Sequence, residues 1–266
     1  PQKTQEANPF FLSLMGGINP RPIEHRVLGR PGKKNGHGAG AVRIIAMATS
    51  VEILWHGQSL KLCSEKAIYL PDSKALLVAD THFGKAATFR QAGIPVPESS
   101  SRDDCIRIEK LIERTNAQSL VFLGDFLHAR VGRTDSVRTE LFDWRQRVSG
   151  IDLHLVRGNH DLQSGDPWPE LEIQCHQDPW KQYGFEFRHL PVERSTDPYF
   201  AGHLHPGFAL KAKGRGSLRS PCFQVGENRI ILPAFGTFTG LSIVKTERDD
   251  RVFMTDGKEV IEVPAS

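Results

Sequence analysis

The sequence has few of the features that mark a secreted, disulfide-linked or membrane protein. It contains only four cysteines, Cys63, Cys105, Cys175 and Cys222, which are far apart and include no C-x-x-C pair. That spacing argues against a disulfide scaffold and against a cysteine-based zinc module. No segment approaches the ~18 consecutive apolar residues of a membrane span, and the apolar run at 10–15 is too short for a secretory signal. We therefore expect a soluble, cytoplasmic protein with buried thiols and no membrane partner.

The positive charge of the chain is concentrated near its N-terminus. The whole sequence has 34 Lys and Arg against 31 Asp and Glu, which gives a net charge of +3. Residues 1–46 are basic and rich in Gly and Pro, and they show no helical or alternating pattern. We interpret 1–46 as a disordered extension and 47–266 as a single, near-neutral domain. Met47, where ordered-looking sequence begins, is a candidate for the native start of the chain, which the mass of the native protein would test.

From residue 51 onward the pattern alternates between strands and helices. Apolar runs at 75–80, 119–125 and 151–159 predict buried strands. Between them, 100–116 and 134–148 carry apolar residues at helical spacing. After about residue 168 short β-like runs dominate, and there is no internal repeat. The pattern predicts an α/β (α+β) domain.

Most of these strand-like runs end in side chains that can bind metal ions. In chain order these side chains are Asp80, His82, Asp125, His128, Asn159, His160, Asp161, His189, His203 and His205. A single histidine at a strand end is more often a hydrogen-bonded structural residue than a ligand. Five such groups in succession form a much stronger pattern, because the carboxyl ends of parallel strands meet at one edge of a sheet.

The composition of this set indicates the ion and the chemistry. Asp, His and Asn without Cys suit hard or borderline divalent ions such as Mn²⁺, Fe or Zn²⁺. The candidates are too many for one tetrahedral site, but they fit two ions that share a bridging carboxylate. Two ions ~3.5–4 Å apart can clamp a phosphoryl group and activate a water molecule. The pattern therefore favours phosphoester hydrolysis.

The order of these motifs resembles a known enzyme superfamily. The string D-x-H, G-D-x-x-H, G-N-H-D, H, G-H-x-H is similar to that of the calcineurin-like metallophosphoesterases. The segments LLVADTHFGKAATFRQAGIPVP, FLGDFLHAR and AGHLHPG resemble the bacterial DNA-ligase-associated metallophosphoesterases, a subgroup described as DNA-repair endonucleases. The resemblance covers roughly 51–245 and does not extend to 1–46. It implies a four-layer αββα sandwich with a two-metal site.

The resemblance also implies a role for each motif residue. One ion would be held by Asp80, His82 and His205, the other by Asn159, His189 and His203, with Asp125 bridging both. His160 would protonate the leaving oxygen, and Asp161 would orient His160 by a hydrogen bond. Mn²⁺ is the expected metal at both positions, with Fe or Zn²⁺ as alternatives.

Two motif positions depart from the pattern of the wider superfamily. His128 stands where many members have an acidic residue, although the narrower subgroup tends to have His there. His189 follows Arg188 rather than a small residue, so His176 is a rival ligand. We favour His189 because it ends a β-like run and lies 14 residues before His203.

Several residues near the motifs could bind substrate. Lys85 and Arg90 follow the first motif and could contact a phosphate backbone, but both also fit the solvated face of a short helix. His128 is a third candidate. Nearby aromatic residues could stack on bases, although aromatic residues beside buried strands usually belong to the core. These aromatic residues are Phe83, Phe89 and Phe126.

The favoured function is a two-metal phosphodiesterase or endonuclease acting on DNA, single-stranded DNA in particular. In the implied mechanism a hydroxide between the ions attacks phosphorus, and His160 assists the leaving group. A repair role beside ligase or helicase partners follows from the resemblance alone. The alternatives are a small-molecule phosphomonoesterase or cyclic-nucleotide phosphodiesterase, and a non-catalytic protein-binding scaffold. The scaffold would have no need of the complete ligand set.

Overall fold

The computed structural model describes residues 48–96, 100–212 and 216–263. The extension predicted at 1–46 lies outside the described residues. The chain divides into two compact units, and the larger consists of Val42–Ala209 and Arg219–Ser266. The fold below is that of this larger unit.

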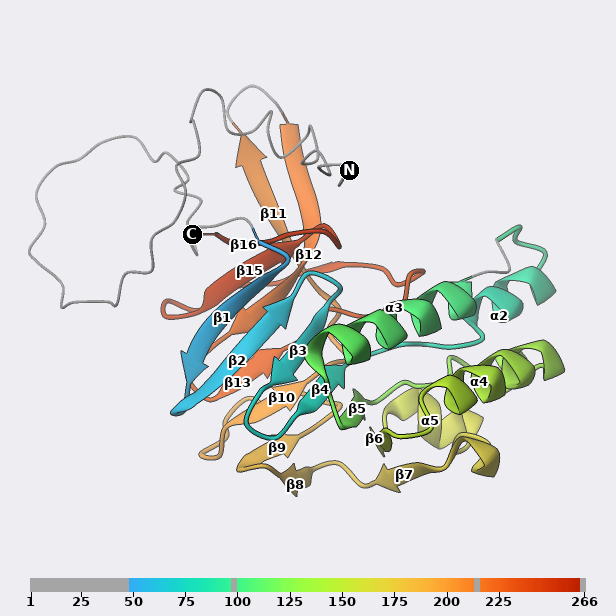
Figure 1. The fold of residues 1–266 in the computed structure, drawn as a ribbon. Coiled ribbons are helices and arrows are strands. Elements are labelled where there is room, and N and C mark those ends of the chain that lie inside the picture. The colour runs from blue at the N-terminus through green and yellow to red at the C-terminus, as the bar shows by residue number, and fades with distance from the viewer. Residues whose placement is uncertain (1–47, 97–99, 213–215, 264–266) are drawn as a thin grey trace, which may run out of the picture. The chain divides into compact units, whose positions relative to one another are not determined.

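The first sheet has seven strands in sequence order (Figure 1). They are β1 (Ser50–Trp55), β2 (Gln58–Cys63), β3 (Ala67–Leu70), β4 (Ala75–Val78), β5 (Ser119–Leu123), β6 (Asp152–Val156) and β7 (Ile173–His176). Pairing is antiparallel from β1 to β4 and parallel from β4 to β7. Every residue of β4 and β5 is buried. Their continuous apolar sequences are what a strand covered on both faces requires.

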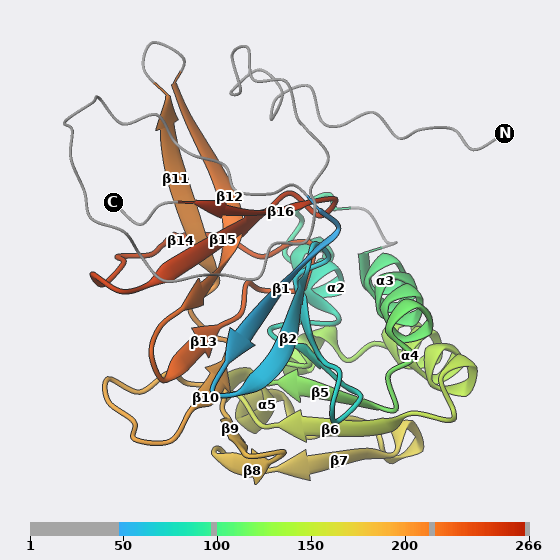
Figure 2. The ribbon, with the colours of Figure 1, turned by 60° about the vertical axis from the view of Figure 1, so that its left-hand side comes forward.

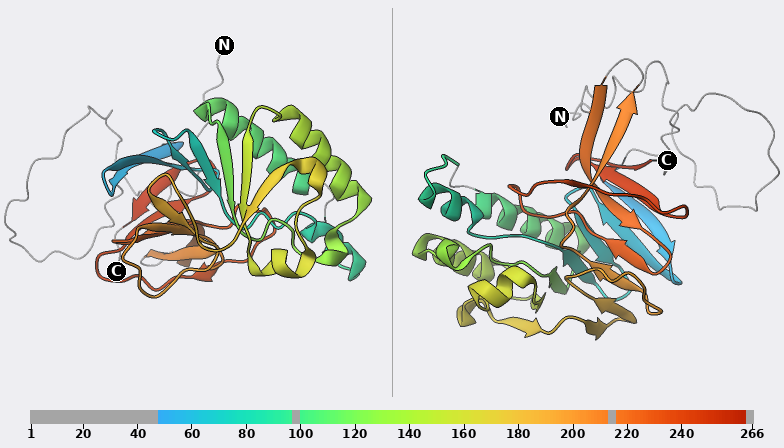
Figure 3. Two further views of the ribbon diagram at one scale, coloured as in Figure 1. Left: turned by 90° about the horizontal axis from the view of Figure 1, so that it is seen from below. Right: turned by 180° about the vertical axis from the view of Figure 1, so that it is seen from behind.

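Helices cover one face of this sheet. The helical elements are α2 (Lys85–Gln91), α3 (Ser100–Thr115), η1 (Arg130–Gly132), α4 (Asp135–Arg147), α5 (Asn159–Ser164) and η2 (Pro169–Leu171). The long helices α3 and α4 lie side by side (Figure 3). Ile108 and Leu111 from α3 and Leu141 and Trp144 from α4 are fully buried in a core shared with the sheet. The apolar residues that recur at helical spacing in the sequence thus lie on the buried faces of α3 and α4.

The second sheet follows along the chain. Its strands are β8 (Trp180–Gln182), β9 (Phe185–Phe187), β10 (Tyr199–Ala201), β11 (Pro206–Ala212), β12 (Gly216–Val225), β13 (Arg229–Ile231), β14 (Ser242–Ile243), β15 (Arg251–Thr255) and β16 (Val260–Val263). The order is β14-β11-β12-β13-β10-β9-β8, and β15 pairs with both β12 and β16. A second core joins the two sheets, in which Leu77 and Val121 share a cluster with Phe200 and Phe223. The two sheets form the sandwich of a mixed α/β fold.

The predicted mixed α/β sandwich is confirmed. Within the described ranges, every helix precedes β7 (Figure 2). A small apolar cluster of the second sheet, Tyr199, Ala201 and Ile231, packs against Val192 from a loop. The β-rich sequence after residue 168 agrees with this distribution of the helices.

All four cysteines are free, and three of them are buried. Burial raises the pKa of the Cys222 thiol to about 12 and that of Cys63 to about 11. Such thiols remain protonated and pack as small apolar groups. Among the described residues, no helix has the length and apolar character needed to cross a membrane.

Candidate metal centre

The motif residues converge where the two sheets meet. Asp80 and His82 follow β4, Asp125 follows β5, and Asn159 begins α5 after β6. The parallel register of these strands places their carboxyl ends side by side. The second sheet contributes the remaining histidines, since His189 follows β9, and His203 and His205 follow β10.

The side chains form two groups, each able to hold an ion. Asp80, His82 and His205 form the first, with ligand atoms all within 4.8 Å of one another. In this group the Nε2 atoms of His82 and His205 are 3.4 Å apart. Asp125, His189 and His203 form the second. The first group has the three residues that the resemblance implies for one ion, and the second has two of the three implied for the other, His189 and His203, together with Asp125.

Asp125 lies between the two groups. Its Oδ2 is 3.9 Å from His82 Nε2, and its Oδ1 is 3.4 Å from His189 Nε2. Asn159 completes the second group, because its Oδ1 is 2.9 Å from His189 Nε2. The structure therefore places one carboxylate near the histidines of both groups and an amide oxygen beside the second group.

The electrostatics of the site favour a cation. Asp80 is fully buried and its Oδ1 has no hydrogen-bond partner. Burial raises the pKa of Asp125 and lowers that of His82 to about 2. The imidazole of His82 is thus neutral and can offer a lone pair, and the buried carboxylates need a positive charge. The donor set and the orphaned oxygen fit divalent ions.

Hydrogen bonds outside the ligand set fix the orientation of individual ligands. The Nδ1 of His189 is 3.1 Å from the carbonyl oxygen of Leu123. An Nδ1–H that donates to this carbonyl leaves the Nε2 lone pair directed at Asn159 and His203. Similarly, Oδ2 of Asp80 accepts the backbone N–H of His203 at 2.8 Å. The two sheets are therefore linked directly through ligand residues.

The backbone at the ligands is strained. Positive φ angles occur at Asp80 (54°), His82 (48°), Asp125 (52°), His203 (68°) and His205 (47°). Left-handed backbone is uncommon for residues other than glycine, and it is retained where function requires it. The left-handed backbone turns the chain sharply after each strand and so directs these side chains toward the centre.

A glycine between β10 and His203 permits a close approach between His203 and Asp80. A Cβ at Gly202 would lie 2.6 Å from Oδ2 of Asp80 and 2.8 Å from Cβ of Ala79. Both distances are far shorter than real contacts allow. The missing side chain therefore lets His203 approach Asp80.

His160 lies beside the first group, and its hydrogen-bond partner is the backbone of His128 and not the side chain of Asp161. Its Nε2 is 3.9 Å from Oδ2 of Asp125, and its Nδ1 is 2.5 Å from the carbonyl oxygen of His128. The sequence motifs predict that Asp161 orients His160 through a hydrogen bond. That prediction is wrong, because both oxygens of Asp161 bind backbone N–H groups instead.

Asp161 is a buried capping residue. Its Oδ1 accepts from Phe126 N–H at 3.0 Å and from Leu127 N–H at 3.3 Å. Its Oδ2 accepts from Gly158 N–H at 2.9 Å. An acidic side chain at the third position of a helix commonly folds back onto the residue before the helix. Asp161 thereby ties α5 to the segment after β5.

A third group combines His128 with two motif residues. Ligand atoms of His82, His128 and His160 lie within 4.8 Å of one another. The rings of His128 and His160 are stacked, with centroids 5.1 Å apart. Burial lowers the pKa of His128 to about 4. The sequence places His128 near the substrate, but no spacing rule indicates that it would join His82 and His160 in this way.

Lys85, one of the two predicted basic contacts, lies near the carboxylates of the centre. Lys85 is half-buried and interacts electrostatically with Asp125 and Asp80. Its Nζ also lies 5.9 Å from the ring of Phe89. Arg90, the other predicted contact, is five residues further along α2.

The other candidate residues lie elsewhere. Phe83 and Phe126 are buried in the helix-side core, as the alternative interpretation predicts. His176 is 3.1 Å from Nδ1 of His154 and stacks on Trp180 at 4.0 Å between centroids. His176 therefore belongs to an aromatic cluster next to β7 and β8 and is in none of the three groups.

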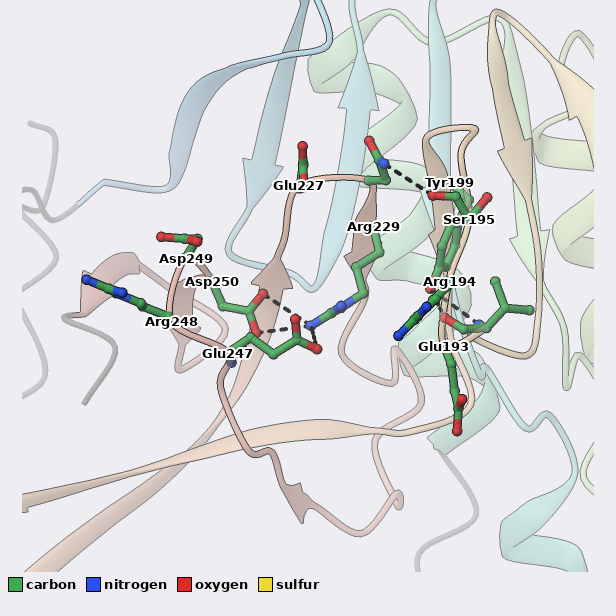
Figure 4. Close-up of a pocket in the computed structure, with 12 residues that line it drawn as sticks. Glu193, Arg194, Ser195, Tyr199, Glu227, Arg229, Glu247, Arg248, Asp249 and Asp250 are labelled. Carbon is green, nitrogen blue, oxygen red and sulfur yellow. Dashed lines mark hydrogen bonds and ion pairs between the residues drawn. The ribbon is translucent and has the colours of Figure 1, made fainter.

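A separate cavity of about 490 Å³ opens beside the second sheet (Figure 4). Arg229 in its wall contacts Glu247 and Asp250, and none of its lining residues belongs to the three histidine-containing groups. The lining residues include no histidine, so this wall offers no imidazole for a transition metal.

Residues 73–220 match the family of calcineurin-like phosphoesterases. The chain belongs to that family. The match spans β4 to β12 and includes every residue of the three groups. The chain is accordingly a metal-dependent phosphoesterase.

Solved structures extend this relationship. The crystal structure of Pseudomonas putida nuclease MPE is 38% identical, with a TM-score of 0.69, and the alignment covers 77% of this chain and 96% of that one. Yfce, a phosphoesterase from E. coli, is 15% identical, with a TM-score of 0.34 and coverage of 72% and 98%. No curated protein sequence matches the chain significantly.

Proposed function

We propose that the chain is a two-metal phosphodiesterase that cleaves DNA, with single-stranded DNA as the preferred form. The observation that carries the proposal is Asp125, a buried carboxylate placed between two groups of metal-binding side chains. The 38% identity to a Pseudomonas putida nuclease supports a nucleic-acid substrate. From the resemblance of the motifs to the DNA-ligase-associated metallophosphoesterases we further propose Mn²⁺ as the metal and a repair role beside ligase or helicase partners in the cytoplasm.

Each group of side chains has a defined task in this function. Asp80, His82 and His205 would hold one ion, and Asn159, His189 and His203 the other, with Asp125 shared. Two divalent ions bound there would neutralise the phosphate oxygens and lower the pKa of a bound water. The left-handed backbone and the buried carboxylates fix these ligands before substrate arrives, so little reorganisation is needed during the reaction.

His160 is placed to move a proton to the leaving oxygen. Its Nδ1–H donates to the carbonyl oxygen of His128 at 2.5 Å, which leaves Nε2 free to carry the transferable proton. Nε2 lies on the Asp125 side of the ring, 3.9 Å from Oδ2. The ring is one-third exposed, so a substrate can reach it. Lys85 adds a positive charge beside the same opening.

A parallel assay tests this function. The purified protein with Mn²⁺ is given bis-nitrophenyl phosphate, nitrophenyl phosphate, a cyclic nucleotide and a single-stranded oligonucleotide. We expect turnover of the aryl diester and the oligonucleotide, and loss of both in Asp125→Ala. Asp249→Ala, which removes an exposed carboxylate from the wall of the separate cavity, is the matched control.

The outcomes separate the alternatives. Turnover of the monoester alone or of the cyclic nucleotide alone would replace the DNA substrate with a small one. No hydrolysis with any divalent ion would favour the non-catalytic scaffold. Near-normal turnover in Asp125→Ala would contradict the bridging role.

A further inference from the structure

A loop of the second sheet borders the first metal-binding group along its length. The 236–242 loop follows β13 and leads into β14. At one end Gly236 N–H donates to the carbonyl oxygen of Asp80 at 3.2 Å, and at the other Ser242 N–H donates to that of His205 at 3.0 Å. The loop therefore runs from one ligand of the group to another.

Side chains of helix α3 hold this loop through hydrogen bonds. Asp104 accepts from the Thr237 hydroxyl at 2.6 Å and is only 3% exposed. Arg107 pairs with Asp104 at 3.0 Å and donates to the carbonyl oxygen of Phe235. Thr239 closes the turn by donating its hydroxyl to the carbonyl oxygen of Gly236 at 2.9 Å. These contacts make the loop a supported wall and fix where its side chains lie.

The wall presents apolar side chains beside a polar centre. Phe235 is fully buried under Arg107, but Phe238 is only partly buried and shares a small cavity with His82 and Lys85. Leu241, at the other end of the loop, is 42% exposed, and Leu204, between two ligand histidines, is 43% exposed. Large apolar side chains at an accessible polar site indicate a ligand with an apolar face.

The phosphodiester group itself needs no such face, because metal ions and Lys85 satisfy its charge. Nucleobases do have one, and aromatic side chains stack on every base with little preference for sequence. We propose that the 236–242 loop is a nucleobase-binding wall of the metal centre and that Phe238 stacks on the base next to the cleaved phosphate. This inference rests on the proposed DNA substrate and adds the group that distinguishes a nucleic acid from a small phosphoester.

DNA strands with and without bases test whether the 236–242 loop binds a nucleobase. The wild-type protein, Phe238→Ala and Phe238→Tyr are compared on a single-stranded oligonucleotide and on a strand of equal length whose central nucleotides are abasic. Phe142→Ala, which removes a phenylalanine that is 42% exposed on α4, is the matched control. Fluorescence anisotropy of labelled strands gives Kd without turnover, and cleavage with Mn²⁺ gives KM and kcat.

We expect Phe238→Ala to weaken binding and raise KM about tenfold on the strand with bases, with Phe238→Tyr and Phe142→Ala close to wild type. The abasic strand should bind wild type and Phe238→Ala equally weakly. Equal losses on both strands, or no loss on either, would overturn the inference while leaving DNA cleavage intact. If the wild type neither binds nor cleaves any strand yet hydrolyses the aryl diester, the DNA proposal itself fails, and the wall fails with it.

Discussion

His160 is oriented by a backbone carbonyl and not by a carboxylate: its Nδ1 lies 2.5 Å from the carbonyl oxygen of His128. The two rings also stack at 5.1 Å between centroids. A neutral carbonyl thus holds Nδ1 of the ring, while Nε2 faces Oδ2 of Asp125 at 3.9 Å. His128 therefore positions His160 through its backbone as well as through its ring.

This arrangement predicts how the His160→Ala variant depends on the leaving group. A nitrophenolate leaves readily without a proton, whereas the alkoxide of a nucleotide does not. We expect kcat to fall about 10²–10⁴-fold on an oligonucleotide, the usual range for a lost general acid, and clearly less on bis-nitrophenyl phosphate. Equal losses on both substrates would show that His160 does not act as the acid.

Asp161 acts on stability through three backbone N–H groups. Because the side chain is 1% exposed, Asp161→Ala leaves those donors buried and unpaired, at about 1–3 kcal/mol for each group. We expect the free energy of unfolding to fall by about 3 kcal/mol in urea titrations of the metal-free protein. Asp152→Ala, at an exposed position of β6, should change it little. An unchanged stability with a fall in kcat alone would restore the predicted role of orienting His160.

The sequence allowed the candidate metal-binding residues to be picked out because each follows a predicted strand. Apolar runs such as 75–80 marked the strands, and parallel pairing then brought Asp80 and Asp125 together. The role of Asp161 could not be read in this way, since a carboxylate next to a histidine in sequence can equally well cap the helix that both belong to.

The 236–242 loop shows why part of the site was missed. Its contacts with Asp80 and His205 are backbone hydrogen bonds between segments far apart in sequence. Such bonds require no particular residue type and leave no spacing pattern. Of the three aromatic residues that the sequence suggested, Phe83 and Phe126 are core residues, and Phe89 is partly buried with its ring 6.3 Å from that of His128. Only the topology of the second sheet brings Phe238 to the centre.

Gly202 provides a test of the packing between the ligands. In Gly202→Ala the new Cβ would meet both Asp80 Oδ2 and Ala79 Cβ at less than 3 Å, so the His203 turn must move away. We expect reduced Mn²⁺ content by elemental analysis and a matching loss of aryl diesterase activity. In Gly150→Ala, where the added Cβ would meet no atom within 4 Å, both should be unchanged. Full metal loading in Gly202→Ala would show that the close approach is not required.

Lys66 should make stability depend on pH. Its Nζ faces the carbonyl oxygen of Gly236 at 3.5 Å. Burial, together with the nearby Arg107 charge, lowers the pKa of Lys66 from 10.5 to about 7, against an opposing effect of Asp104. The unfolded chain therefore keeps this proton at pH values where the folded chain has lost it, so the free energy of unfolding rises with pH between about 7 and 10.5. Lys66→Met should be more stable than wild type at pH 7, and this advantage should shrink as the pH approaches 10. Urea titrations across that range measure the difference, and a constant difference between the two proteins would show that Lys66 stays charged in the fold.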